Sequence, residues 1–186
     1  MANLEVGESG DAEGLLDKEI GDKYFKTVAI LTYLVKKGQL YRSQVGKTFI
    51  QKLMYLIGKE LNRDFGYRFH FYGPYSSLVE GGLNYASFLK SVDIHWDVNH
   101  GYFIKPRKNA SVFTEILSGE EKEKIGNILD EYGGLTVQDL SIVTTAYYLQ
   151  ERYELSGDDL IEAVGKMKSY DIKRIRELLE AHRIFE

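Results

Sequence analysis

Apolar residues recur at intervals of three and four along most of this chain, which is the spacing of amphipathic helices. The spacing predicts one helix from Asp22 to Lys37, ended by Gly38, and a second from Gly46 to Asn62. Later helix starts are marked by Ser or Thr with an acidic residue three positions on, the spacing of a capping box. These starts are Ser77 with Glu80, Ser118 with Glu121, Thr136 with Asp139 and Ser156 with Asp159, and a last amphipathic helix includes Ile172 to His182.

Two other regions have the patterns of β-strands. The segment from Tyr67 to Tyr72 alternates with period two and predicts a strand that Gly73-Pro74 ends. The segments Val92 to Val98 and Tyr102 to Pro106 flank Asn99-His100-Gly101, and they predict a β-hairpin because these three residues favour turns. We therefore expect an α+β fold that is mostly α-helical.

The order of these elements predicts three parts. Residues 1–20 are rich in Gly and acidic residues and seldom place two apolar residues together, so they predict an acidic flexible tail. Residues 21–108 place helices before the hairpin, an order that predicts a winged-helix-like subdomain with the hairpin as its wing. Residues 109–186 predict an acidic helical subdomain packed on it.

The composition excludes several classes of protein. The 186 residues include no cysteine, which rules out disulfides, cysteine-ligated metals and cysteine nucleophiles. The longest apolar run, Val28 to Val35, is far shorter than the ~20 residues of a membrane-spanning helix, and the first residues lack the pattern of a signal peptide. We expect a cytoplasmic protein that has no membrane association, no metal and no cofactor.

The net charge of −4 conceals three blocks of opposite sign. Residues 1–22 hold seven acids and one base, residues 23–108 hold fourteen bases and five acids, and residues 109–186 hold nine bases and sixteen acids. A basic block between two acidic ones favours an anionic partner, either nucleic acid or an acidic protein. The alternative is that the blocks attract each other within the fold.

Two groups of basic residues predict where an anionic partner binds. On the second helix, one face opposite the apolar stripe contains Lys52, Tyr55, Lys59 and Arg63. The far arm of the hairpin ends in Lys105, Arg107 and Lys108. These residues are our candidates for contact with nucleic acid or with an acidic protein, although the helix before the hairpin has few basic residues for gripping phosphates.

A second cluster predicts a pocket. In the alternating segment Arg68, His70 and Tyr72 share one face, and Tyr75 and Ser76 follow the Gly-Pro turn. These residues could bind an anion or a peptide, as in a small-ligand sensor or an enzyme. They could equally form a hydrogen-bonded structural layer, because buried tyrosines and histidines usually serve that purpose.

One short motif resembles a phosphate-binding loop. The residues Val45-Gly46-Lys47-Thr48 match its end, but the position five residues before Gly46 holds Tyr41 where the loop needs glycine. We therefore expect Lys47 and Thr48 to begin a helix.

Three segments carry a resemblance to known families. The segments Gly46 to Leu56, Tyr67 to Ser76 and Leu140 to Leu149 together resemble the uncharacterised YwgA-like proteins of bacteria and archaea. The first two, with Tyr-Gly-Pro-Tyr-Ser as the most specific part, are also distantly similar to the Panacea domain of SocA-like antitoxins. The resemblance implies a compact helical domain without known catalysis that neutralises a toxin or acts as an adaptor. We thus expect a non-enzymatic binding, adaptor or regulatory protein, possible partners being nucleic acid, a protein such as a toxin, or a second copy in a homodimer.

Overall fold

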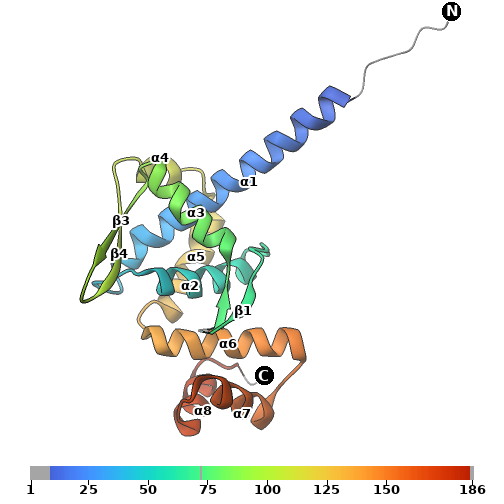
Figure 1. Ribbon diagram of the computed structural model, residues 1–186, viewed down its shortest axis with the longest axis vertical. Helices are drawn as coiled ribbons and strands as arrows, with labels where there is room; N and C mark the ends of the chain where they lie inside the picture. The colour runs from blue at the N-terminus through green and yellow to red at the C-terminus, as the bar shows by residue number, and fades with distance from the viewer. Residues whose placement is uncertain (1–8, 72, 185–186) are drawn as a thin grey trace, which may run out of the picture.

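The computed structural model describes residues 9–71 and 73–184, except for the side chains of residues 9–20, 22, 23 and 168. Its described residues form an α+β fold that is mostly helical, as expected (Figure 1). The helices are α1 Ser9–Gly38, α2 Lys47–Glu60, α3 Ser77–Phe88, α4 Ala110–Thr114, α5 Gly119–Tyr132, α6 Val137–Tyr153, α7 Gly157–Lys168 and α8 Ile172–Ala181. The strands are β1 Arg68–His70, β2 Gly73–Tyr75, β3 Val92–Asp97 and β4 Gly101–Pro106.

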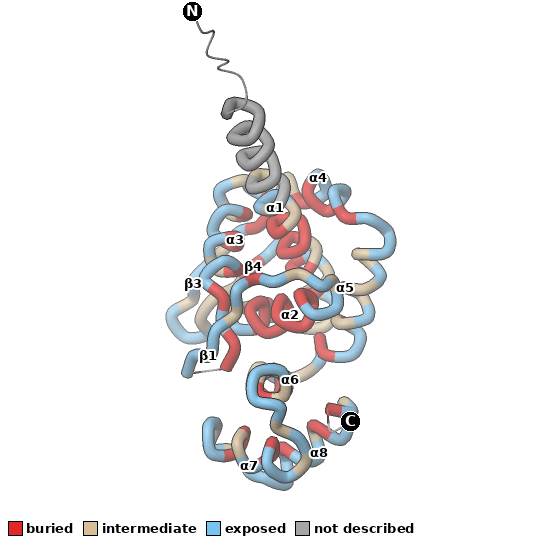
Figure 2. Tube along the Cα trace, turned by 90° about the vertical axis from the view of Figure 1, so that its right-hand side faces the viewer, coloured by how far each residue is buried: buried red, intermediate tan, exposed pale blue. Residues whose placement is uncertain are grey.

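Helix α2 lies at the centre of the molecule. It packs against α1, α5, α6 and both β-hairpins, and every residue from Phe49 to Gly58 is buried (Figure 2). Its apolar stripe includes Ile50, Leu53 and Ile57, none of which is exposed to solvent. Each such side chain stabilises the fold by about 1.5–3 kcal/mol when it leaves water.

Helix α1 is longer than its apolar pattern predicts. It begins at Ser9, so the backbone of residues 9–20, which we expected to be a flexible tail, is helical, and residues 1–8 lie outside the described part of the chain. The buried segment Val28 to Val35 packs among α3, α4 and α5. A helix anchored in this way extends easily, because each added residue gains a hydrogen bond without a new nucleation step.

The segment after α2 forms a hairpin instead of the single strand we expected. Arg68 pairs with Tyr75 and His70 with Gly73, so the Gly-Pro dipeptide begins β2 and does not simply end β1. Gly73 has φ +89°, a conformation that favours glycine and that lets the chain reverse here. Phe69, which alternates with Arg68 and His70 along β1, contacts Tyr148 of α6, with 5.6 Å between the ring centroids.

The helix starts agree with the capping pattern at two of the four expected positions. Ser118 and Glu121 form the expected capping box, and the Thr136 side chain accepts a hydrogen bond from the Asp139 N–H. Helix α3 is capped one residue earlier than expected, because Ser76 and not Ser77 accepts the hydrogen bond from the Val79 N–H. The cap expected from Ser156 makes no side-chain hydrogen bond.

The second hairpin forms as predicted and lies over the first turn of α2. Strands β3 and β4 pair from Val92 opposite Pro106 to Asp97 opposite Gly101. The Ile104 N–H donates to the Val45 carbonyl at 2.8 Å. Because Val45 directly precedes Gly46, the N-cap of α2, this hydrogen bond joins β4 to the start of that helix.

Packing continues across the expected subdomain boundary between residues 108 and 109. Helix α4 packs on α1, and α5 packs on both α1 and α2, so these two helices complete the core around α2. Helices α7 and α8 contact each other and α6, on the side of α6 away from α2 (Figure 1). Helix α2, in the basic block of the sequence, therefore packs against α5 and α6 of the acidic C-terminal part of the chain.

Candidate binding pockets

The basic face expected on α2 is not an exposed surface. The Lys52 side chain is 2% exposed and Tyr55 is 5% exposed. The Lys52 ammonium donates a hydrogen bond to the Pro74 carbonyl at 2.9 Å. These two residues are covered because the β1–β2 hairpin and α6 pack on the face of α2 opposite its apolar stripe.

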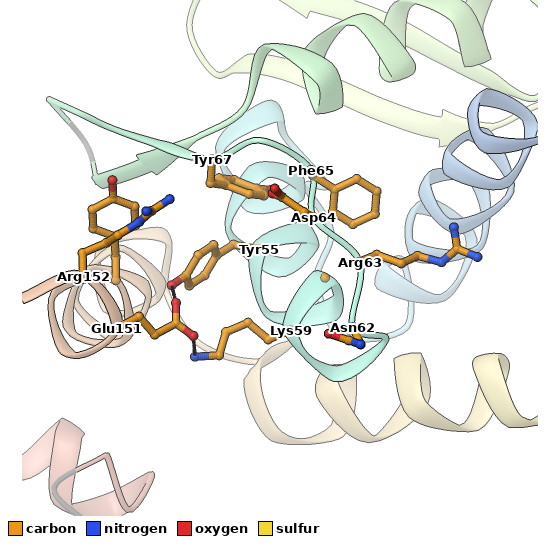
Figure 3. Close-up of a pocket in the computed structure, with 11 residues that line it drawn as sticks. Tyr55, Lys59, Asn62, Arg63, Asp64, Phe65, Tyr67, Glu151 and Arg152 are labelled. Carbon is orange, nitrogen blue, oxygen red and sulfur yellow. Dashed lines mark hydrogen bonds and ion pairs between the residues drawn. The ribbon is translucent and has the colours of Figure 1, made fainter. Parts of the chain in front are cut away.

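The other two basic residues of that face are paired with acidic residues of the C-terminal part. Lys59 forms an ion pair with Glu151 of α6, and the same carboxylate accepts a hydrogen bond from the Tyr55 hydroxyl at 2.7 Å (Figure 3). Arg63 extends away from Glu151 and lies 3.8 Å from a carboxylate oxygen of Glu121. These pairs agree with the alternative in which the oppositely charged blocks attract each other.

These residues line a small cavity between α2 and α6, which we call the α2–α6 pocket (Figure 3). Its volume is about 230 Å³, and it adds Tyr67, Tyr148 and Arg152 to the residues that the sequence pattern suggested. Burial raises the pKa of Tyr67, and burial together with the hydrogen bond to Glu151 raises the pKa of Tyr55. Both phenols therefore remain neutral donors at physiological pH.

A larger cavity lies between the first half of α2 and the β1–β2 hairpin, and we call it the Gly-Pro pocket. Its volume is about 390 Å³, which is within the usual range for small-ligand sites. It brings together three residues from the two predicted groups, Lys52, His70 and Tyr75. The residues that sequence reasoning did not assign to it include Lys47 and Gln51 of α2 and Glu80 of α3.

Hydrogen bonds hold the walls of the Gly-Pro pocket in place. The Gln51 amide donates to the Ser76 carbonyl at 2.9 Å and accepts from the Ser76 N–H at 3.0 Å. The Lys47 ammonium lies 2.5 Å from a Glu80 carboxylate oxygen, and this pairing raises the pKa of Lys47 although partial burial opposes the rise. Among the described lining residues, two ammonium groups face one carboxylate, so the pocket is electropositive.

The remaining residues of the predicted pocket have other positions. Arg68 is exposed on β1 and does not line the cavity. Ser76 is fully buried, and its hydroxyl donates to the Phe65 carbonyl and caps α3, so its role is structural. Tyr72 lies outside the described residues. His70 and Tyr75 do converge, with 5.6 Å between their ring centroids.

The basic arm of the β3–β4 hairpin is exposed, but it is separate from the basic residues near the end of α2. Lys105, Arg107 and Lys108 are exposed, and Arg107 lies 3.7 Å from Asp93. The hairpin contacts the first turn of α2, where the Lys47 ammonium lies 4.2 Å from the centre of the Tyr102 ring. Lys59 is twelve residues further along α2, about 18 Å along the helix axis.

The sequence singled out Lys47 only through its partial match to a phosphate-binding loop, and it contained no signal for Gln51 or Glu80 as pocket residues. Lys47 and Glu80 read as residues of helix starts, and Gln51 lies within a mainly apolar helix. Only the approach of α2, α3 and the hairpin to one another joins them.

Comparisons with known proteins return no relative. No protein-family model, no curated protein and no solved structure matches this chain. Over residues 9–71 and 73–184, no group of His, Asp and Glu side chains has an arrangement that could hold a metal ion. None of the helices in that part of the chain is long and apolar enough to cross a membrane.

Proposed function

We propose that this chain is a non-enzymatic binding protein that accepts an acidic side chain of a partner protein in the Gly-Pro pocket. The observation that carries the proposal is the Lys52 ammonium, which is buried and yet lines a cavity of about 390 Å³. An adaptor or antitoxin-like role, which the family resemblance implies, is part of the same proposal.

The charge of the pocket favours an anion. Burying an ammonium group costs several kcal/mol unless hydrogen bonds and opposite charge offset the cost. Lys52 has the Pro74 carbonyl as one acceptor, and Glu80 is paired with Lys47. A carboxylate entering the cavity would add a charged acceptor beside Lys52 where solvent screening is weak.

The surroundings of the pocket favour a protein as the source of that carboxylate. Phe71 of the hairpin is 86% exposed, and Phe69 and Tyr75 are partly exposed. Aromatic residues are enriched in protein interfaces, where they bury a large area. A nucleic-acid duplex needs an open row of cations, whereas Lys59 and Arg63 are engaged with Glu151 and Glu121.

Nucleic-acid binding by a winged-helix-like arrangement is the second candidate. It is supported by the exposure of Lys105, Arg107 and Lys108 and by the order of α1, α2 and α3 before the β3–β4 hairpin. In this case the hairpin arm would contact phosphates, and affinity would fall steeply as salt concentration rises.

The proposal is tested by fluorescence anisotropy with a labelled peptide in which glutamates alternate with leucines. We expect the wild-type protein to bind it at least about tenfold more tightly than the matching glutamine peptide, since buried charge pairs contribute about 1.5 kcal/mol or more. Lys52→Met should remove this preference, and His70→Ala should weaken binding by a smaller factor. The matched control is His95→Ala, which changes an exposed histidine on the other hairpin.

Because His70 is exposed, we expect His70→Ala to keep the stability of the wild type. This variant therefore tests the pocket even if Lys52→Met lowers the stability of the protein. The proposal fails if the glutamate and glutamine peptides bind equally, or if both variants bind as well as wild type. It also fails if labelled duplex DNA binds more tightly than the peptide and Lys105→Glu with Lys108→Glu abolishes that binding, a result that supports the second candidate.

A further inference from the structure

Arg42, in the segment between α1 and α2, has a buried nitrogen without a hydrogen-bond partner. This atom is Nε, and one terminal nitrogen of the same side chain lies 3.5 Å from the Leu135 carbonyl. The guanidinium carbon lies 4.5 Å from the centre of the Phe49 ring. In the described part of the chain Arg42 forms no ion pair, and burial lowers its pKa. A partly buried cation with a buried, unpartnered N–H is stabilised by an anion that accepts from it.

Arg42 lines a cavity between the turn of the β3–β4 hairpin and the first turn of α2, which we call the hairpin pocket. The cavity has a volume of about 360 Å³ and also contains Lys47 and Thr48 in its wall. Its described lining includes two cations and neither Asp nor Glu. The Gln44 amide holds the hairpin against this wall by donating to the His100 carbonyl at 2.6 Å. The charge of the pocket therefore suits an anion such as a phosphate group.

The β3–β4 hairpin contributes aromatic residues to the wall of the hairpin pocket. Trp96 is the single tryptophan of the chain and is 58% exposed, and its ring centroid lies 4.7 Å from that of Tyr102. Flat aromatic surfaces beside positive charge bind nucleobases by stacking, at about 1–3 kcal/mol per base. A cavity whose wall contains cations and an exposed indole fits a ligand that carries both a phosphate and a planar ring.

We propose that the hairpin pocket binds a nucleoside monophosphate, with the phosphate against Arg42 and Lys47 and the base against Trp96. The site differs from the Gly-Pro pocket, with which it shares only Lys47 and Thr48 among the described lining residues. Binding would supply the acceptor that the Arg42 Nε–H lacks. It would also fix the β3–β4 hairpin relative to α2.

Trp96 provides a direct test, because stacking of a base on the only indole changes its fluorescence. We titrate adenosine monophosphate, adenosine and inorganic phosphate separately, and free N-acetyltryptophanamide corrects for absorption by the base. The monophosphate should quench Trp96 emission saturably and bind more tightly than adenosine or phosphate. Arg42→Gln should weaken monophosphate binding by about tenfold or more while leaving adenosine binding unchanged. The matched control is Arg68→Gln, which removes an exposed arginine outside the pocket.

A second readout covers the variant without the fluorophore. Thermal unfolding of Trp96→Ala should show stabilisation by the monophosphate no larger than that by ribose 5-phosphate. The proposal is overturned if the monophosphate causes no saturable quenching, if Arg42→Gln binds it as tightly as wild type, or if adenosine binds equally well. Unchanged binding of the glutamate peptide to Arg42→Gln separates this site from the Gly-Pro pocket.

Discussion

Glu121 is a single residue that connects three parts of the fold. Its carboxylate accepts hydrogen bonds from the Lys26 ammonium at 2.6 Å and from the Ser118 N–H at 2.8 Å. The same side chain lies 3.8 Å from Arg63. Partial burial opposes ionisation, but these donors lower the pKa of Glu121 below its ordinary value of 4.5. The carboxylate therefore stabilises α1, α5 and the end of α2 in one arrangement when it is charged.

Glu121→Gln should lower the free energy of unfolding by about 1 kcal/mol at neutral pH, because glutamine keeps the capping geometry but loses the charge facing Lys26. The folded-state pKa is lowered, so the contribution is complete above pH 4.5 and is lost as the pH falls through the folded-state pKa. Urea unfolding of both proteins measures the difference. A difference in the free energy of unfolding that persists unchanged well below pH 4.5 would contradict this explanation. A similar loss of stability in the exposed control Glu123→Gln would also contradict it.

Residue-scale patterns predicted which residues share a helix face but not which of them are buried or paired. The sequence places Lys52 and Lys59 on one helix face, and that face exists. Burial of Lys52 depends on Pro74, and neutralisation of Lys59 depends on Glu151, ninety-two residues away in the chain. Helical periodicity describes one element and carries no information on which element covers its polar side.

At the scale of elements, α2 ends under a loop that crosses it closely. A Cβ added at Gly58 would lie 2.9 Å from the Arg63 carbonyl oxygen and 2.9 Å from the Phe65 ring. Gly126 in α5 has no such neighbour within 4 Å. The two glycines occur within helices of equal length but have opposite environments.

Gly58→Ala should therefore destabilise the protein by about 1–3 kcal/mol, since backbone and ring must move apart. Gly126→Ala should stabilise it by roughly 0.5–1 kcal/mol, because alanine has the higher helix propensity. Chemical denaturation of both variants gives the comparison. Equal changes in the same direction would show that the loop does not constrain the end of α2.

The elements themselves were predictable to different degrees. Apolar periodicity and capping residues predicted α2, α5 and α6, and turn residues predicted the β3–β4 hairpin, because these signals are local. The β1–β2 hairpin was missed because Gly73-Pro74 reads as the end of a strand, whereas pairing with β1 extends it. The start of α1 was misplaced because composition does not reveal a helix that grows from a buried anchor.

At the scale of the whole molecule, the basic block of the sequence pairs with the acidic C-terminal block in the fold. Lys26, Lys59 and Arg63 of the basic block lie against Glu121 and Glu151 of the acidic C-terminal block. Other cations of the basic block lie in cavity walls, among them Lys52 in the Gly-Pro pocket, Arg42 in the hairpin pocket, and Lys47, which also pairs with Glu80, in both. Net charge along the chain could not distinguish these two groups, because the difference arises from tertiary contacts.

The central claim is that the Gly-Pro pocket receives an acidic group, and an amide NMR titration with the glutamate peptide tests it most directly. We predict saturable shift changes that cluster at Thr48, His70, Gly73 and Tyr75, and much smaller changes with the glutamine peptide. Changes centred on Lys59 and Arg152 in the α2–α6 pocket, or on the hairpin arm from Lys105 to Lys108, would contradict the claim, as would the absence of any saturable change.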